Sequence, residues 1–356
     1  MNKLGILVVT PSIPLYDRTA GGYRIYNMIK VLLNRYSVSL LSLRYRPELS
    51  VYEKELRESG VNIIYLEPNG SIKDAVSGRE FKKVVIEFCN TGDDWLSIAK
   101  EFETAELITD SHCLNFLEDE RMRALGLESG GYEISKSAEL ELYSISDMII
   151  TVTEMEKDIL ASEIGGKIEV IPTGTVIPDE VRPRKGRNNI LFVGSMNRTQ
   201  NIDAVSYFCG KVFPDVKAVL NEVTLTIAGS GADSGNLSFI PESAAVTGFV
   251  RDIGVYYSSY AVSVVPLRVG AGMKSKIIES MAWGCPVVST VVGAEGMGFT
   301  PGNDILIADD PKEFAEKIVN IYTDQDLWNK ISLNAYQKVK EYYDIGRMSD
   351  LILDLI

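Results

Sequence analysis

One stretch of the sequence, PLRVGAGMKSKIIESMAWGCPVVST, combines glycines, cations and a carboxylate at a spacing suited to phosphate binding. Its candidate residues are Gly270, Gly272, Lys274, Lys276 and Glu279. The glycines let the backbone approach a ligand closely, and a helix expected from about Met273 would present unpaired N–H groups and a positive dipole end. Lysines in a first turn oppose that dipole, which favours a ligand-binding role for them. The alternative is a glycine-rich turn in which Lys276 and Glu279 form a surface ion pair.

Three further glycine-containing loops follow strand-like runs. TPSIPLYDRTAGG contains Gly21 and Gly22, LFVGSMNRTQ contains Gly194 and Arg198, and LTIAGSG contains Gly229. Each loop by itself is consistent with a plain turn. Four such loops at four strand ends favour anion binding, because ligands of open parallel sheets bind at the carboxyl ends of the strands.

The chain has a single histidine, His112, and four scattered cysteines. One histidine excludes multi-histidine zinc sites and any mechanism that needs two. The cysteines, at positions 89, 113, 209 and 285, have neither metal-ligand spacing nor a disulfide framework. We therefore expect reduced thiols, a cytoplasmic protein and no metal site.

Size and charge restrict the class of protein. A length of 356 residues favours two domains. The formal net charge of −13 argues against nucleic acid and strongly anionic membranes as partners, although Lys3, Arg44 and Arg46 leave room for peripheral membrane contact. No apolar run is long enough for a transmembrane segment, and residues 4–10 are interpreted as a buried strand rather than a signal peptide.

Short apolar runs alternate with helical patterns along the whole chain. The expected strands are residues 4–10, 38–43, 61–66, 107–110, 148–152, 168–172, 190–194, 223–228, 245–250, 261–266, 286–289 and 305–308. The expected helices include residues 23–34, 133–143, 155–162, 202–213 and 311–323. Continuous apolar strands are typical of parallel sheets covered on both faces, so the fold class is doubly wound α/β. A proline-rich linker at 171–189 divides the chain into domains 1–180 and 181–335, with a terminal helix, 336–356, packing back on the first.

The second half resembles a GT-B glycosyltransferase of family 4. The resemblance covers residues 190–343 through FVGSM, LTIAGSG, VTGFVRD and PLRVGAGMKSKIIESMAWGCPVVSTVVGAEGM, and the first half is similar more loosely through PLYDRTAGG, ITDSH and IEVIPTG. It implies two Rossmann-like domains facing across a cleft. It also implies transfer of a sugar from a nucleoside diphosphate donor with retention at the anomeric carbon. No cofactor is implied, and a divalent metal is allowed for but not expected.

The resemblance implies roles for individual residues. Glu279 matches the glutamate that holds the donor ribose hydroxyls, and His112 matches a histidine near the transferred sugar, for which a structural role is the alternative. The residues expected to contribute to catalysis are His112, Lys274 and Arg198. Those expected to bind the donor are Gly21, Gly22, Gly194, Gly229, Phe249, Val250, Arg268, Gly270, Ala271, Gly272, Met273, Lys276 and Glu279.

Three positions depart from the family pattern. The first glutamate of its Glu-x7-Glu element falls on Ala271, which leaves the donor sugar open. The arginine and lysine that many members place after the first strand of this half fall on Ser195 and Asn201. Neutralising the departing diphosphate would then fall to Arg198, Arg268, Lys274 or Lys276.

The predicted function is therefore a retaining hexosyltransferase that uses a UDP-glucose or GDP-mannose type of donor and a glycan, lipid-linked or protein acceptor. No carboxylate pair suited to a double displacement is apparent, which favours attack on the same face of the sugar as the leaving group. A nucleotide-sugar epimerase of related fold remains an alternative. So does a non-catalytic nucleotide-sugar-binding protein, which Ala271 suggests.

Overall fold

The computed structural model describes residues 3–87, 94–128, 135–179, 188–231 and 237–356. The chain divides into two compact units. Unit 1 comprises Met1–Asp119, Gly131–Thr173 and Gly346–Ile356, and unit 2 comprises Glu120–Gly130 and Gly174–Ile345. The expected domain boundary at residues 180 and 181, the start of the expected helix 133–143 and Cys89 lie outside the described residues.

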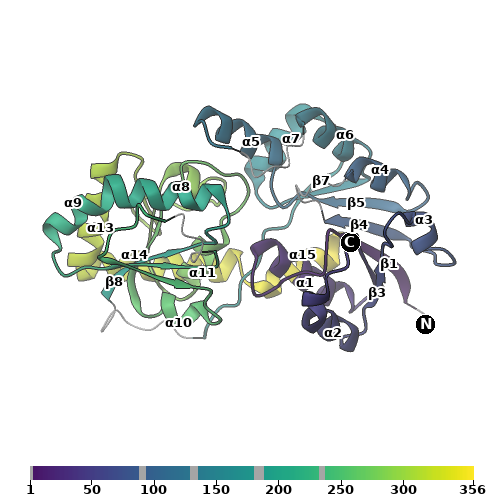
Figure 1. The fold of residues 1–356 in the computed structure, drawn as a ribbon, viewed down its shortest axis with the longest axis horizontal. Helices are drawn as coiled ribbons and strands as arrows, with labels where there is room; N and C mark the ends of the chain where they lie inside the picture. Colours follow the sequence, from purple (N-terminus) through teal and green to yellow (C-terminus); the bar gives the residue numbers. More distant parts are fainter. Residues whose placement is uncertain (1–2, 88–93, 129–134, 180–187, 232–236) are drawn as a thin grey trace. The chain divides into compact units, whose positions relative to one another are not determined.

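Unit 1 is built on a parallel sheet with the strand order β3-β2-β1-β4-β5-β6-β7 (Figure 1). Its strands are β1 (Leu4–Thr10), β2 (Tyr36–Ser42), β3 (Asn62–Tyr65), β4 (Lys83–Glu87), β5 (Glu106–Asp110), β6 (Met148–Thr151) and β7 (Ile168–Val170). Its helices are α1 (Ala20–Leu32), α2 (Ser50–Glu58), α3 (Ile72–Ala75), α4 (Trp95–Lys100), α6 (Lys136–Ser144) and α7 (Glu154–Glu163). Helix α5 (Asn115–Ala124) continues from unit 1 into a segment of unit 2.

The apolar runs become the buried centres of these strands. In β1, Ile6, Leu7, Val8 and Val9 are fully buried, as expected for a parallel strand with helices on both faces. Strand β4 is a correction to the expected strand list, because it lies between β1 and β5 in the middle of the sheet. Its apolar run is only Val84–Ile86 between lysines and a glutamate, too short to stand out in the sequence.

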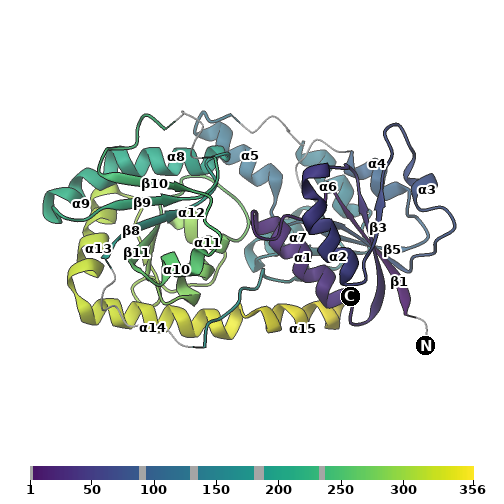
Figure 2. The same ribbon diagram turned by 60° about the horizontal axis from the view of Figure 1, so that its bottom comes forward.

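The last helix, α15 (Ile345–Leu355), returns the chain to unit 1. Figure 2 shows α15 alongside α1, as the sequence predicted for the C-terminal helix. The hydroxyl of Tyr36 donates a hydrogen bond to the carbonyl of Ile356, the final residue, at 2.5 Å. This contact fixes the end of the chain beside the start of β2.

Unit 2 is built on a second parallel sheet with the strand order β10-β9-β8-β11-β12-β13. Its strands are β8 (Asn188–Val193), β9 (Leu225–Ala228), β10 (Ala244–Gly248), β11 (Tyr260–Val265), β12 (Val287–Ser289) and β13 (Leu306–Ile307). Its helices are α8 (Thr199–Tyr207), α9 (Phe213–Val219), α10 (Ile253–Tyr257), α11 (Ser275–Ala282), α12 (Val291–Ala294), α13 (Pro311–Thr323) and α14 (Gln325–Tyr342). All six strands expected for this half are present.

The two parallel sheets confirm the predicted fold class of two Rossmann-like domains. In the part of the chain that the structure describes, no helix is both long enough and apolar enough to cross a membrane.

Close packing of strand ends in unit 2 depends on Gly229. Its N–H donates to the carbonyl of Gly248 at 2.9 Å, and its φ of +150° is rarely adopted by residues with side chains. A Cβ at this position would lie 2.0 Å from the carbonyl oxygen of Gly194 on the neighbouring strand end. The glycine is thus required by packing between β8 and β9, whatever a ligand adds.

We expect Gly229→Ala to destabilise the protein by about 1–3 kcal/mol. The alanine would be strained at this φ, and its Cβ would push the backbone away from Gly194. The measurement is the midpoint of urea unfolding. Gly210→Ala is the matched control, since Gly210 is exposed, lies in a helical segment and has nothing within 4 Å of an added Cβ. The control should be neutral or stabilising by up to ~1 kcal/mol, and an equal loss in both variants would contradict this account.

Candidate functional site

In unit 1, two adjacent strands end in carboxylates. Glu87 ends β4 and Asp110 ends β5, and the two residues are direct partners in the strand register. Both side chains are fully buried. His112 follows Asp110 by two residues, so the sole histidine lies at the carboxyl edge of this sheet, where ligands of parallel sheets bind.

Helix α1 supplies the charge that compensates Asp110. Arg24, which is 1% exposed, donates from Nε and Nη2 to the two oxygens of Asp110 at 2.7 and 2.9 Å. Its Nη1 donates to the carbonyl of Ile171 at 2.8 Å and more weakly to the hydroxyl of Thr173 at 3.4 Å. This buried, bidentate ion pair fixes α1 against β5 and the segment after β7.

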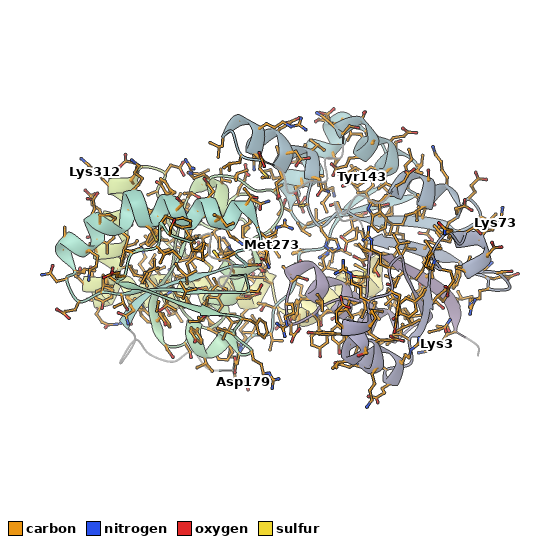
Figure 3. All side chains as sticks on the ribbon, in the orientation of Figure 1. Lys3, Lys73, Tyr143, Asp179, Met273 and Lys312 are labelled. Atoms are coloured by element: carbon orange, nitrogen blue, oxygen red, sulfur yellow. The ribbon has the colours of Figure 1, made fainter. Side chains whose placement is uncertain are left out.

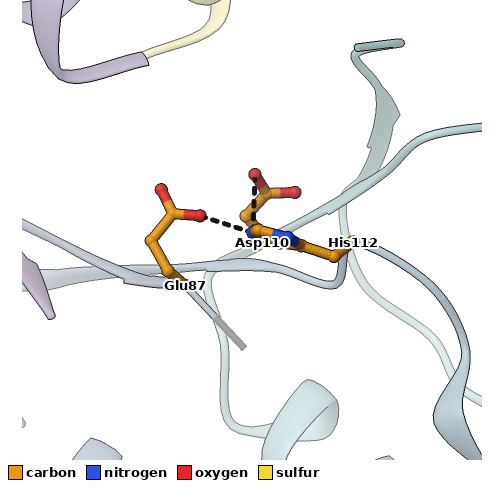
Figure 4. A group of neighbouring side chains, drawn as sticks. All are labelled: Glu87, Asp110 and His112. Carbon is orange, nitrogen blue, oxygen red and sulfur yellow. Dashed lines mark hydrogen bonds and ion pairs between the residues drawn. The ribbon is translucent and has the colours of Figure 1, made fainter. Parts of the chain in front are cut away.

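Glu87 holds the imidazole of His112. The Nε2 atom of His112 lies 2.7 Å from Oε2 of Glu87 and 3.8 Å from Oδ2 of Asp110 (Figure 4). The histidine has a φ of +53°, and the N–H of Cys113 closes a three-residue turn on the carbonyl of Ser111. A non-glycine residue in this conformation is strained by about 1–3 kcal/mol and persists only where its surroundings impose it.

Gly21 lies on the other side of the ring. A Cβ on Gly21 would be 3.2 Å from Nδ1 of His112, which is tighter than most real Cβ contacts, so the glycine lets α1 begin this close to the imidazole without displacing the ring. Gly22 has a different reason, because a Cβ there would lie 2.5 Å from the carbonyl oxygen of Leu15. The hydroxyl of Thr19 caps the helix by accepting from the N–H of Gly22 at 3.0 Å.

The ligand atoms of Glu87, Asp110 and His112 lie within 4.8 Å of one another, a spacing that could hold a metal ion. Both oxygens of Asp110 already accept from Arg24, so a cation would compete with a guanidinium. Burial raises the pKa of Glu87, and the negative charge of Asp110 raises it further, against the opposing effects of His112 and Arg24. The donor set therefore fits a shared proton better than a metal ion.

In unit 2, the loop before α11 differs from the expectation in one respect. The helix begins at Ser275 rather than near Met273, with Lys274 as the N-cap and no side-chain cap. The ammonium of Lys274 donates back to the carbonyls of Ala271 and Gly272 at 3.0 and 2.7 Å. Met273, labelled in Figure 3, packs against the core of unit 2. Gly270 and Gly272 have φ values of +150° and +67°, which a loop of this shape requires.

Lys276 projects from the first turn of α11 toward the end of β8. Its Nζ donates to Oδ1 of Asn201 at 2.8 Å and lies 4.7 Å above the ring centre of Phe192. Asn201 in turn donates to the carbonyl of Ser195 at 2.9 Å. Gly194 leaves room for this contact, since a Cβ there would lie 2.8 Å from Cγ of Asn201.

Burial lowers the pKa of Lys276 to about 7, with a further decrease from the positive charge of Lys274 and Arg198. The negative charge of Glu279 raises this pKa, but by less than the other effects lower it. The ammonium has a neutral amide and an aromatic ring as its closest partners. A bound anion would therefore stabilise the charged form of Lys276.

Glu279 lies one turn further along α11 and is partly exposed. Burial raises the pKa of its carboxyl group, while hydrogen bonding with Ser275, the charge of Lys276 and hydrogen bonding with Tyr257 lower it. Glu279 lies one helical turn after Ser275, so its side chain is on the same helical face as the start of α11.

The structure also places the remaining predicted residues of unit 2. Arg268 is engaged by Asp203 of α8, to which its Nε donates at 3.0 Å, and its guanidinium lies 5.4 Å from the ring centre of Tyr207. Arg198 is exposed and forms the N-cap of α8. Phe249 and Val250 follow β10, where Val250 packs against a small apolar cluster. The structure thus gives Arg268 a protein partner that the sequence did not indicate.

Sequence reasoning missed four residues that organise these sites. Arg24, Glu87 and Asp110 surround the histidine, and Asn201 receives Lys276. Glu87 could have been found from the 40 residues between the expected strands 61–66 and 107–110, which are too many for one crossover without a further strand.

The two parallel sheets define the GT-B fold class of two Rossmann-like units. Residues 187–324 match the family model of the glycosyl transferases group 1. For this part of the chain, the family resemblance and the glycosyltransferase class predicted from the sequence are confirmed.

One curated relative is an uncharacterized 44.6 kDa protein in the cps region of Klebsiella pneumoniae, 28% identical over 166 residues. The match spans 44% of this chain and 42% of that relative. Similar solved structures include the sucrose-phosphate synthase of Thermosynechococcus elongatus, with a TM-score of 0.75 and 15% identity over 99% of this chain and 98% of that one. A glycosyltransferase of Rickettsia africae has a TM-score of 0.73 and 16% identity, over 100% and 98%. Anabaena HepE, in complex with UDP and glucose, has a TM-score of 0.72 and 15% identity, over 99% and 98%.

The lowered pKa of Lys276 predicts a pH-dependent affinity for a diphosphate group, for which UDP is the test ligand. The free protein holds the ammonium charged below about pH 7 and loses it above, whereas a bound diphosphate raises the pKa. Affinity should therefore fall several-fold between about pH 7.5 and about pH 9, a range in which the phosphates are already ionised. Isothermal titration calorimetry measures this. Lys276→Met should bind more weakly with a flatter pH profile, and equal profiles in the two proteins would remove Lys276 as the cause.

Proposed function

We propose that this chain is a retaining glycosyltransferase that moves a hexose from a nucleoside diphosphate sugar to a hydroxyl group of a glycan. The observation that carries the proposal is the position of Lys276, whose ammonium lies 2.8 Å from Oδ1 of Asn201. The family resemblance implies a lysine at position 201, and here a lysine from α11 reaches the same strand end. Lys276 would thus supply a cation at this strand end.

The nucleotide part of the donor is assigned to unit 2. The start of α11 and the loop of Gly270, Ala271, Gly272 and Met273 would hold the diphosphate, with Glu279 on the ribose hydroxyls. A carboxylate that accepts from two vicinal hydroxyls suits this task. Further contacts to the nucleotide are assigned to Gly194, Gly229, Phe249, Val250 and Arg268 in unit 2. Gly21 and Gly22 remain predicted donor-binding residues of unit 1.

Catalysis requires stabilisation of the leaving diphosphate as the bond to the anomeric carbon lengthens. Cations and helix N-termini placed at that charge lower the barrier more than they stabilise the bound substrate. Lys274, Lys276 and Arg198 are proposed for this role, and His112 is proposed to act on the transferred sugar. The leaving phosphate would help to deprotonate the acceptor hydroxyl, giving retention by attack on the same face.

The proposed donors are UDP-glucose first and GDP-mannose second. The complex of HepE with UDP and glucose supports testing UDP first. The relative in a cps region supports a polysaccharide as acceptor, ahead of lipid-linked or protein acceptors. We further propose that the enzyme acts in the cytoplasm, needs no cofactor or metal, and that its specificity for the donor sugar does not depend on a carboxylate at position 271.

A panel of nucleotide sugars tests the function. Each is incubated with the protein, with and without sugar acceptors and with EDTA, and nucleotide release and new nucleotide sugars are measured. Acceptor-dependent release with an unchanged rate in EDTA supports the proposal. Conversion to an isomeric nucleotide sugar would favour the epimerase, and binding with no turnover at all would favour a binding protein.

Replacing Glu279 by alanine should weaken UDP binding about 10-fold or more, because hydrogen bonds to a charged group are worth about 1.5–3 kcal/mol. Calorimetric affinity for UDP is the measurement, and Glu316→Ala, on the exposed face of α13, is the matched control. Affinity for inorganic pyrophosphate should be much less affected, since pyrophosphate has no ribose. Unchanged UDP affinity in Glu279→Ala would take Glu279 out of the site.

A further inference from the structure

One group at the unit 1 site has no role in the function proposed above. Glu87 is fully buried, and its Oε1 has no hydrogen-bond partner among the described residues. An ionised carboxylate left in this state is costly, and its neighbour Asp110 is negative as well. The only polar group that it contacts in the described chain is Nε2 of His112, at 2.7 Å.

We propose that Glu87 is the positioning residue of His112: the two side chains share one proton, and this makes Nδ1 of the imidazole a hydrogen-bond donor toward the ligand. The inference rests on the proposed role of His112 at the transferred sugar. It adds a second residue to that role and gives the histidine a defined chemical task.

The number of protons on Glu87 and His112 decides whether Nδ1 is a donor or an acceptor. The shared proton is one beyond the proton that a neutral imidazole carries by itself. If it is on the ring, the ring is an imidazolium, so Nε2–H donates to the carboxylate and Nδ1–H is also present. If it is on Glu87, the carboxyl donates to Nε2, and the neutral ring must carry its own proton on Nδ1. Both arrangements present Nδ1–H, and only loss of the shared proton turns Nδ1 into an acceptor.

The surroundings favour keeping that proton. Facing the pair are Asp110 on β5 and Arg24 on α1, whose charges cancel in a bidentate ion pair. Burial and Asp110 raise the pKa of Glu87, which opposes loss of the proton. The side chain of His112 is 13% exposed while those of Glu87 and Asp110 are fully buried, so the imidazole is the member of the cluster that a ligand can reach.

One ring nitrogen remains for a ligand. Glu87 occupies Nε2, and the start of α1 lies beside Nδ1, where a Cβ on Gly21 would be 3.2 Å away. A donor at this point can hydrogen-bond a sugar hydroxyl or an oxygen that gains negative charge in the transition state.

Nuclear magnetic resonance of protein labelled with ¹⁵N-histidine tests the proposal directly, because His112 is the only histidine. At about pH 7.5 the wild-type protein should show a protonated Nδ1, whereas Glu87→Gln should show a largely unprotonated Nδ1 or a mixture of tautomers. Glu139→Gln is the matched control, since Glu139 is equally buried in unit 1 but accepts from the backbone N–H groups of Asn115 and Phe116. An unprotonated Nδ1 in the wild-type protein at this pH would overturn the proposal.

Kinetics supply the second test. Glu87→Gln should lower kcat about 10- to 100-fold, the usual cost of removing a carboxylate that orients an imidazole, and leave KM for the nucleotide sugar within about twofold. In a His112→Ala background the same change should have no further effect on kcat, whereas a merely structural role would lower the rate in both backgrounds.

The outcomes separate the two proposals. A His112→Ala variant as active as wild type would remove the histidine from the reaction, and the role of Glu87 with it. An inactive His112→Ala beside a fully active Glu87→Gln would overturn the role of Glu87 alone. If no sugar transfer is found at all, the proposed function fails, and the labelled histidine still decides whether Glu87 sets the proton on Nδ1.

Discussion

The buried ion pair between Arg24 and Asp110 is the interaction on which the site in unit 1 depends. Burying two charges costs about as much as their attraction returns, so such a pair is weak evidence for stability alone. Its geometric consequence is clearer. Gly21 precedes Arg24 by one helical turn, and His112 follows Asp110 by two residues. Fixing α1 on β5 through this pair therefore also fixes the start of the helix against the imidazole.

A comparable constraint in unit 2 depends on an amide instead of a charge. Asn201 accepts from Lys276 and donates to the carbonyl of Ser195, so one side chain connects α8, α11 and the end of β8. Gly194 is small because Asn201 needs the space. The family resemblance implies a cation at position 201, and here an asparagine instead orients a cation that comes from another helix. The structure therefore places a cation at this strand end although position 201 itself is neutral.

The sequence predicted the alternation of strands and helices well, because buried parallel strands are continuous apolar runs. It failed at β4, where three apolar residues stand between charged ones, and the missed strand carries Glu87. The same limit applies to contacts. Glycines and lysines near α11 could be recognised from their spacing, but the pairing of Lys276 with Asn201, 75 positions away, is set by how α8 and α11 pack on β8. The local sequence pattern predicts helices and strands, whereas the partner of a charged side chain depends on how these elements pack together.

The charges are compensated within the site in unit 1 but not in unit 2. This difference bears on which site is organised before a ligand binds. In unit 1, Arg24 cancels Asp110 and a proton shared with His112 would cancel Glu87, so the cluster needs no ion from outside. In unit 2, the closest partners of Lys276 are a neutral amide and a ring, and burial lowers its pKa to about 7. An anion that binds there restores the proton and gains the full attraction of the ammonium. The diphosphate of a donor would thus complete the electrostatics of unit 2, while unit 1 is already organised before any ligand binds.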